Sequence, residues 1–272
     1  MDISKISAYY LVGGSSTNNL RRHIGYNIYN NGWKYFIDHY IRKDVDLGIR
    51  RFHLHNPFGL DALQATMPFN QLRECKHSPD TNLSSLAYDF TTCWSNIINE
   101  LDIEVTAYIG CLRADAAFDS LSVLDAIDYF DECTMDIVKS RCNVAIDSVA
   151  RIGVDDIRYG LMRRLELQLM SHGRRLFQEP RPDINMPHLH RFPVIGLAKF
   201  FRRSDPDKYK DAAGLYANNS AFNNYQLIVV QEPGEELGEL AKIVSEYPDA
   251  DSYIISRLST YNKPVSELIA DI

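Results

Sequence analysis

The sequence lacks the features of a disulfide-stapled or membrane-spanning protein. Its five cysteines are an odd number and no two show CxxC spacing, so we expect reduced thiols and no disulfide framework. The first residues lack the apolar core of a signal peptide, and no apolar run approaches the ~18 residues that span a bilayer. These absences predict a cytoplasmic protein without a membrane partner.

Positive charge is also in short supply. Lysine and arginine number 29 against 36 aspartates and glutamates, which gives a formal net charge of −7. The arginine pairs, such as Arg50-Arg51 and Arg202-Arg203, are scattered along the chain and form no basic stripe. Because nucleic-acid binding depends on clustered lysine and arginine, we expect no nucleic-acid partner.

Familiar cofactor and catalytic motifs are missing as well. The chain contains no GxGxxG after a strand-like run, no P-loop, no GxSxG and no HExxH. These absences disfavour a nucleotide-binding protein and a zinc peptidase, and we expect no cofactor.

What the sequence does contain is a repeated alternation of short β-type runs and helical stretches. The runs lie at 6–12, 49–54, 103–109, 144–146, 175–178, 193–197, 226–230 and 252–256. Helical spacing occupies 33–45, 85–100, 117–139, 155–171 and 235–247, with a closing helix at 264–270. Eight such repeats in 272 residues predict one domain, 1–272, with the α/β fold of a (β/α)8 TIM-type barrel. The helix after the first run and the connection before the sixth are weak, so a seven-stranded or open α/β sheet is the alternative.

Acidic side chains follow the strand candidates. Two neighbouring runs each end on a carboxylate, Asp147 and Glu179, and Glu232 follows the seventh run. Two nearby carboxylates cannot both ionise freely, so one is suited to act as general acid and the other as nucleophile or base. Glycosidic cleavage uses such a pair, at about 5–5.5 Å in retaining enzymes and about 6.5–9.5 Å in inverting ones. We predict Asp147 and Glu179 as the catalytic pair, with Glu232 as the alternative partner. Each acid is equally suited to a structural role as a helix cap or ion-pair partner.

Other polar residues follow the same strand ends, where (β/α)8 barrels meet their substrates. The predicted substrate-binding residues are His53, His55, Asn56, Tyr108, Arg113 and Arg181. His53 and His55 are two apart on a strand, so their side chains share one face and are suited to bind a divalent metal ion together with Asp147, Glu179 or Glu232. Asn56 offers both a donor and an acceptor to a sugar hydroxyl.

Three strand ends carry a resemblance to a known group. The segments Tyr108-Ile109-Gly110, Ile146-Asp147-Ser148 and Glu179-Pro180-Arg181-Pro182 resemble the (β/α)8 glycoside hydrolases in layout. The resemblance implies a hydrolase that cleaves a carbohydrate, with Asp147 and Glu179 as its carboxylates. Many retaining barrels carry Asn-Glu where this chain has Ile146-Asp147, so Glu232 alone meets that pattern.

Two other functions fit the same residues. One is a metal-dependent barrel enzyme, such as a sugar isomerase or phosphoesterase, with His53, His55, Asp147 and Glu179 around a divalent ion. The other is a non-catalytic carbohydrate-binding or assembly protein on a barrel scaffold, because fold does not imply function. The pattern favours no particular oligomeric state.

Overall fold

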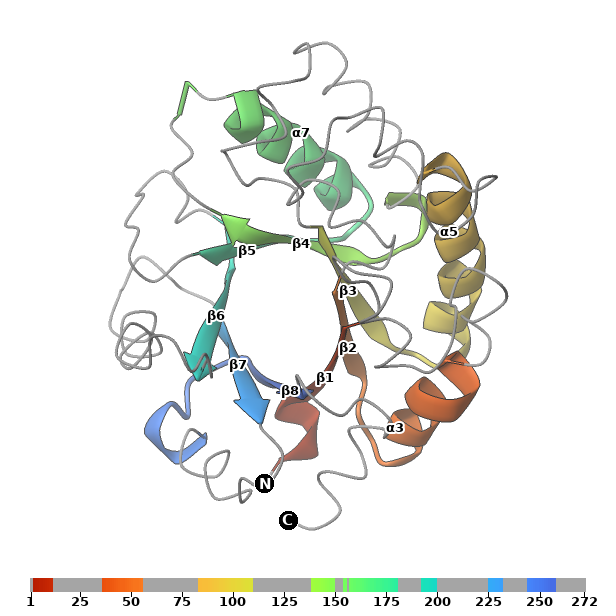
Figure 1. Cartoon of the computed structure of the whole chain (residues 1–272), viewed down its shortest axis with the longest axis vertical. Helices are drawn as coiled ribbons and strands as arrows, with labels where there is room; N and C mark the ends of the chain where they lie inside the picture. Colours follow the sequence, from red (N-terminus) through yellow and green to blue (C-terminus); the bar gives the residue numbers. More distant parts are fainter. Residues whose placement is uncertain are drawn as a thin grey trace.

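A computed structural model shows eight parallel strands that close into a barrel in sequence order (Figure 1). It describes residues 2–11, 36–55, 83–109, 138–149, 154–155, 157–180, 192–199, 225–231 and 244–257. The strands are β1 Ile6–Leu11, β2 Arg51–His55, β3 Glu104–Ile109, β4 Asn143–Val149, β5 Leu176–Pro180, β6 Val194–Lys199, β7 Tyr225–Gln231 and β8 Ser252–Arg257. Pairing of β8 with β1 closes the sheet. The predicted (β/α)8 fold is therefore confirmed, and the seven-stranded and open alternatives are excluded.

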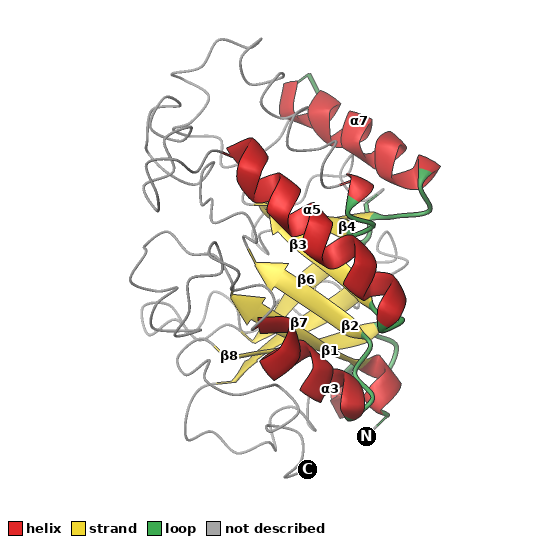
Figure 2. Cartoon of the chain, turned by 90° about the vertical axis from the view of Figure 1, so that its right-hand side faces the viewer, coloured by secondary structure: helices red, strands yellow, loops and turns green. Residues whose placement is uncertain are grey.

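Helical segments cover the outside of the barrel (Figure 2). A short 3-10 turn, η1 Ile3–Lys5, precedes β1; the helices are η3 Ile37–Ile41, which continues into α3 Arg42–Asp46, then α5 Leu83–Glu100 and α7 Ile157–Ser171. Two helices end at a glycine with positive φ, Gly48 at 100° and Gly173 at 69°, as expected where the chain must take a left-handed conformation. The predicted helices at 33–45, 85–100 and 155–171 are confirmed within a few residues. Of those at 117–139 and 235–247, the described residues 138–139 and 244–246 are helical; the helix at 264–270 lies outside the described residues.

Strand alternation gives the barrel an apolar outer face and a partly polar inner face. Tyr10 faces outward, where its ring contacts Phe36 and Tyr40 of the first helical segment. Tyr9 faces inward, because its ring contacts Tyr108 of β3 across the intervening strand, with centroids 5.3 Å apart. Buried apolar residues share the outward parity of Tyr10: Ala8, Phe52, Leu54, Val105, Ala107, Val144 and Ile146. Packing against the helices therefore supplies much of the described core, and the interior carries polar groups.

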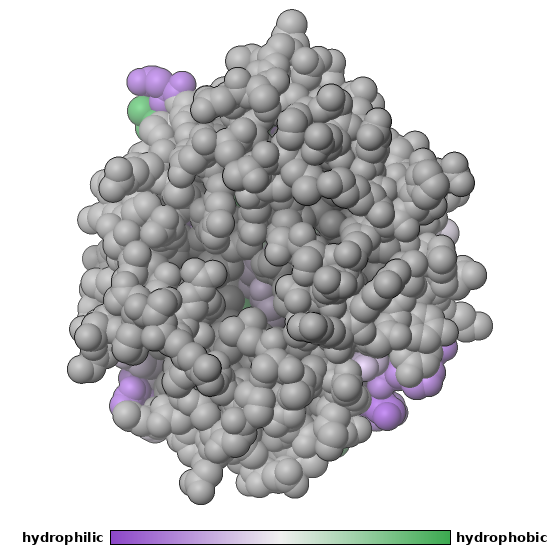
Figure 3. All heavy atoms as spheres, viewed as in Figure 1, coloured by the Kyte–Doolittle hydropathy of each residue, from purple (hydrophilic) through white to green (hydrophobic). Residues whose placement is uncertain are grey.

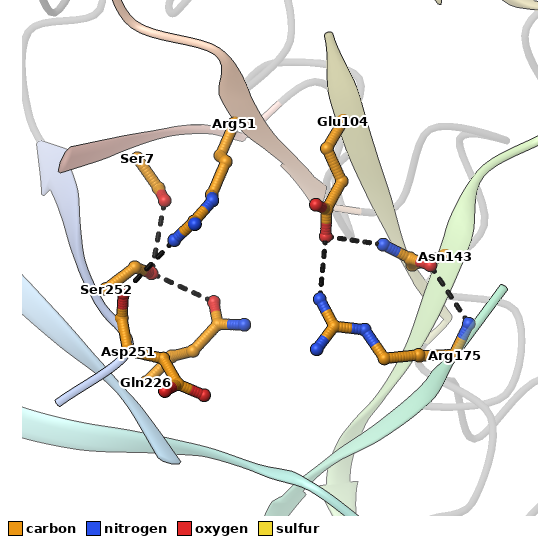
Figure 4. Close-up of polar contacts among 8 residues, drawn as sticks. All are labelled: Ser7, Arg51, Glu104, Asn143, Arg175, Gln226, Asp251 and Ser252. Carbon is orange, nitrogen blue, oxygen red and sulfur yellow. Dashed lines mark hydrogen bonds and ion pairs between the residues drawn. The ribbon is translucent and has the colours of Figure 1, made fainter. Parts of the chain in front are cut away.

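At the amino-terminal end of the barrel, two groups of side chains form hydrogen bonds between strands (Figure 4). Glu104 Oε1 accepts hydrogen bonds from Asn143 Nδ2 at 2.7 Å and from Arg175 Nη2 at 3.1 Å. On the other side of the barrel, Ser7 Oγ donates to Ser252 Oγ at 3.1 Å and Ser252 Oγ donates to Gln226 Oε1 at 3.0 Å. These bonds tie strands together at the end of the barrel where polar residues serve stability.

Most strands extend beyond the predicted bounds at their carboxyl ends, and two of the extensions, in β4 and β6, are irregular. The prediction placed Asp147 at the end of its strand, and the structure corrects this, because β4 continues to Val149. The sixth strand continues to Lys199 rather than ending at residue 197. Each of these two extensions contains a register shift, between Ile146 and Val149 in β4 and between Leu197 and Lys199 in β6. An apolar run marks only the regular part of a strand, so sequence patterning misses irregular ends.

Candidate functional site

The carboxyl ends of β2, β4 and β5 carry three of the predicted site residues. His55 is the last residue of β2, Asp147 lies in the last three residues of β4, and Glu179 is the next-to-last residue of β5. Because all strands are parallel, their carboxyl ends lie at one end of the barrel, and β4 and β5 are neighbours. The fold therefore places one histidine, one aspartate and one glutamate at backbone positions on one sector of this rim.

A β-bulge lies where the backbone of Asp147 on β4 runs beside that of Glu179 on β5. Ile146 pairs with Gln178 and Val149 pairs with Pro180, so Asp147 and Ser148 on β4 oppose Glu179 alone on β5. Such two-against-one irregularities bend a strand and re-aim its side chains, and they are frequent next to active sites. The backbone at Asp147 thus departs from the regular ladder at the predicted catalytic position.

His53 lies inside the barrel and is almost fully buried, with 2% of its surface exposed. Its Nδ1 nitrogen lies 3.2 Å from the hydroxyl oxygen of Tyr108, which is buried on β3. The two rings meet edge to face with centroids 5.7 Å apart, and Tyr9 packs against Tyr108. The structure therefore brings the predicted residues His53 and Tyr108 together inside the barrel.

The environment of His53 keeps its ring neutral. Burial, with a smaller effect of the positive charge on Arg51, lowers the pKa of His53 from 6.5 to about 3. Within the described part of the chain, its other ring nitrogen, Nε2, has no hydrogen-bond partner. A ring nitrogen that no protein group engages is available to a ligand, as a donor when it carries the proton and as an acceptor or metal ligand when it does not.

Four predicted site residues, Asn56, Arg113, Arg181 and Glu232, lie outside the described residues. In the space-filling view of Figure 3, the coloured atoms are those of the described residues. They show as a small patch near the centre and as mostly hydrophilic areas at the edge. The roles of these four residues stay predictions.

Sequence reasoning overlooked Tyr9 as part of this interior group. A signal was available, because Tyr9 has the same alternation parity as Ser7 and pairs in register with His53. Its neighbour Tyr10 is equally aromatic but faces the helices. Composition alone does not separate two adjacent tyrosines, whereas the phase of the strand does.

The described residues contain neither a cluster of metal-binding side chains nor a membrane-spanning helix. No group of three or more His, Cys, Asp and Glu side chains suited to a metal ion occurs among the residues whose side chains the structure describes. For His55, Asp147 and Glu179, the structure describes the backbone and its position in the strand. No helix within the described ranges is long and apolar enough to cross a membrane.

Comparison with known proteins finds only distant similarity. No protein-family model matches the chain, and no curated protein sequence matches it. Solved structures that match include "Crystal Structure of SacUVDE" (12% identity, TM-score 0.43, covering 97% of this chain and 96% of that one). Others are an AP endonuclease, family 2, from Brucella melitensis (12%, 0.47, 98% and 97%) and an HpcH/HpaI aldolase from Desulfitobacterium hafniense DCB-2 (7%, 0.46, 98% and 89%).

These similarities are too low to transfer a function. None of the three structures is named as a glycoside hydrolase. The resemblance inferred from the sequence is confirmed for its barrel layout, by the strand order of this chain itself. The closed order of eight parallel strands establishes, independently of any neighbour, that this chain has an α/β TIM-type barrel fold.

Proposed function

We propose that the protein is a metal-dependent barrel enzyme whose divalent ion lies at the carboxyl ends of β2, β4 and β5. The candidate residues for the site are His53, His55, Asp147 and Glu179. This is the alternative that the sequence left open beside the glycosidase.

The observation that carries the proposal is the state of His53. Its imidazole is buried and neutral, one ring nitrogen is held by Tyr108, and the other has no partner among the described residues. A neutral imidazole is the form that binds a metal. A glycosidase acid pair needs no such group, whereas a metal site gives the open nitrogen a ligand.

The placement of the other candidates supports the same site. His55 follows His53 by two residues, so the two lie ~6.6 Å apart along β2 and share strand parity. Asp147 and Glu179 lie at the same end of the barrel on neighbouring strands. Mixed imidazole and carboxylate ligands favour Zn²⁺, Mn²⁺, Fe²⁺ or Co²⁺ over Ca²⁺.

The chemistry would be metal-assisted hydrolysis of a phosphoester or metal-assisted isomerisation of a sugar. When bound, a divalent ion polarises an oxygen of the substrate or lowers the pKa of a bound water. In this proposal one of Asp147 and Glu179 would hold the ion, and the other would accept the proton from the attacking water or the substrate. Buried Tyr9 and Tyr108 keep solvent water from reaching His53 from within the barrel.

The glycosidase is the second candidate, and one observation favours it. The bulge in β4 places Asp147 and Ser148 opposite Glu179. Because a bulge changes the local spacing of the strands, it favours a carboxylate pair whose separation differs from that of a regular ladder. Both candidates use these two acids, so loss of activity on their substitution does not separate them. Dependence on a metal ion does.

Metal analysis of the purified protein tests the proposal. We expect stoichiometric zinc, manganese, iron or cobalt in protein prepared without chelator, and loss of that metal in His55→Ala and in one of Asp147→Asn and Glu179→Gln. The matched control is His172→Ala, because His172 is an exposed histidine that follows α7 at the opposite end of the barrel. A protein that retains no metal, and binds none of these four ions on titration, would refute the metal site and leave the carboxylate pair.

A further inference from the structure

His53 and Tyr108 form a buried pair whose hydrogen bond can run in two directions. A neutral imidazole carries one proton, on either Nδ1 or Nε2. If the Tyr108 hydroxyl donates to Nδ1, the proton lies on Nε2, which then acts only as a donor. If Nδ1 donates to the Tyr108 oxygen, Nε2 keeps its lone pair. The contact of 3.2 Å is compatible with both directions.

The two directions correspond to different functions of the site. A protonated Nε2 donates a hydrogen bond to a substrate oxygen and cannot bind a metal. A bare Nε2 binds a metal and donates nothing. Metal-binding histidines ordinarily give their second ring proton to an oxygen acceptor, which fixes both the tautomer and the ring orientation. Tyr108 places such an oxygen beside Nδ1.

We propose that Tyr108 is a positioning residue, which accepts a hydrogen bond from Nδ1 of His53 and so directs the bare Nε2 nitrogen to the metal ion. The inference rests on the metal-dependent function proposed above. Tyr108 acts through His53 and does not itself touch the ion.

The packing around Tyr108 makes it suited to hold one orientation. Its ring is fully buried and contacts His53 at 5.7 Å and Tyr9 at 5.3 Å between centroids, in both cases edge to face. These contacts hold the ring, so a phenylalanine in its place keeps the packing and removes only the hydroxyl. The substitution Tyr108→Phe thus removes the hydrogen bond to His53 and leaves the ring contacts in place.

The first part of the test observes the tautomer in the wild-type protein. The chain has eight histidines, and labelling them with ¹⁵N gives long-range proton–nitrogen spectra in which protonated and bare ring nitrogens are distinct. The His53 signals are those that disappear in His53→Asn. We expect the metal-free protein to show protonated Nδ1 and bare Nε2, and Zn²⁺ to shift the Nε2 signal.

The second part measures Zn²⁺ affinity by calorimetry. We expect Tyr108→Phe to bind Zn²⁺ about 10–100-fold more weakly than wild type, the usual effect of removing a partner of a metal-binding histidine. Tyr253→Phe is the matched control, because it removes another buried tyrosine hydroxyl, one that donates to the Tyr247 carbonyl at 2.6 Å. It should bind Zn²⁺ as wild type does.

The outcomes separate this inference from the proposed function. Wild type that binds Zn²⁺ with Nε2 of His53 protonated would overturn the role of Tyr108 and leave the metal site at the other residues. The same holds if Tyr108→Phe binds Zn²⁺ as tightly as Tyr253→Phe does. Wild type that binds no divalent ion would overturn the proposed function itself, and this inference with it.

Discussion

The buried state of His53 predicts that this residue makes the protein sensitive to acid. In the folded protein its pKa is lowered from 6.5 to about 3, chiefly by burial. Between these values the unfolded chain binds a proton that the folded protein excludes, so the free energy of unfolding falls as the pH falls. Above pH 6.5 the imidazole is neutral in both states and has no effect of this kind.

The size of the effect follows from the difference in pKa. Each pH unit below 6.5 costs about 1.4 kcal/mol, so acidification from pH 7 to pH 5 removes about 2 kcal/mol through His53 alone. The variant His53→Asn keeps a polar side chain beside Tyr108 and does not titrate. Groups common to both proteins cancel when the two are compared, so the difference between their pH profiles reports His53.

Urea unfolding followed by fluorescence measures this difference. At pH 7 and pH 8 the two free energies of unfolding should run parallel, which serves as the internal control. At pH 5 wild type should have lost about 2 kcal/mol more than His53→Asn. Parallel profiles down to pH 5 would refute the argument, because they would show that the folded protein accommodates the charged imidazole as readily as water does.

Three further predictions concern other parts of the barrel. Asp147→Asn and Glu179→Gln should each abolish turnover while leaving the melting temperature nearly unchanged, since both lie at the rim; a matching loss of folding in thermal melts would instead make them structural. Asn143→Ala should lower the free energy of unfolding by ~1–3 kcal/mol, because the buried amide bonds both to the neighbouring acid on β3 and to a backbone N–H before β5; urea titration showing no change would contradict this. Tyr10→Phe should cost ~1–3 kcal/mol by removing the hydroxyl that donates to the fully buried Asp44, and equal midpoints for variant and wild type in thermal unfolding would exclude a stabilising role for that bond.

The architecture was predictable because it is encoded in local patterns. Eight short apolar runs recur along the chain, most of them followed by helical spacing, and the order of a (β/α)8 barrel follows from parallel strands joined by helices. Gly173 as the end of a helix was likewise predictable, since the left-handed conformation there favours glycine. Each of these features depends on residues that are close in the sequence.

The site was only partly predictable. Strand ends located His55, Asp147 and Glu179 on one rim, because the carboxyl ends of parallel strands share one end of a barrel. The sequence did not reveal the bulge at Asp147, since pairing two residues against one is a property of the register between β4 and β5.

The clearest contrast is between His53 and its surroundings. The sequence by itself determined that His53 and His55 share strand parity and that a barrel would bring them to one end. Only the tertiary structure decided that Tyr108, fifty-five positions away, lies against Nδ1 and that Tyr9 packs behind it. Pairing of β2 with both β1 and β3 brings together side chains from the three strands, and burial inside the barrel is what keeps the imidazole neutral. Local sequence fixes which face a residue takes, and the closed barrel fixes its neighbours and therefore its chemistry.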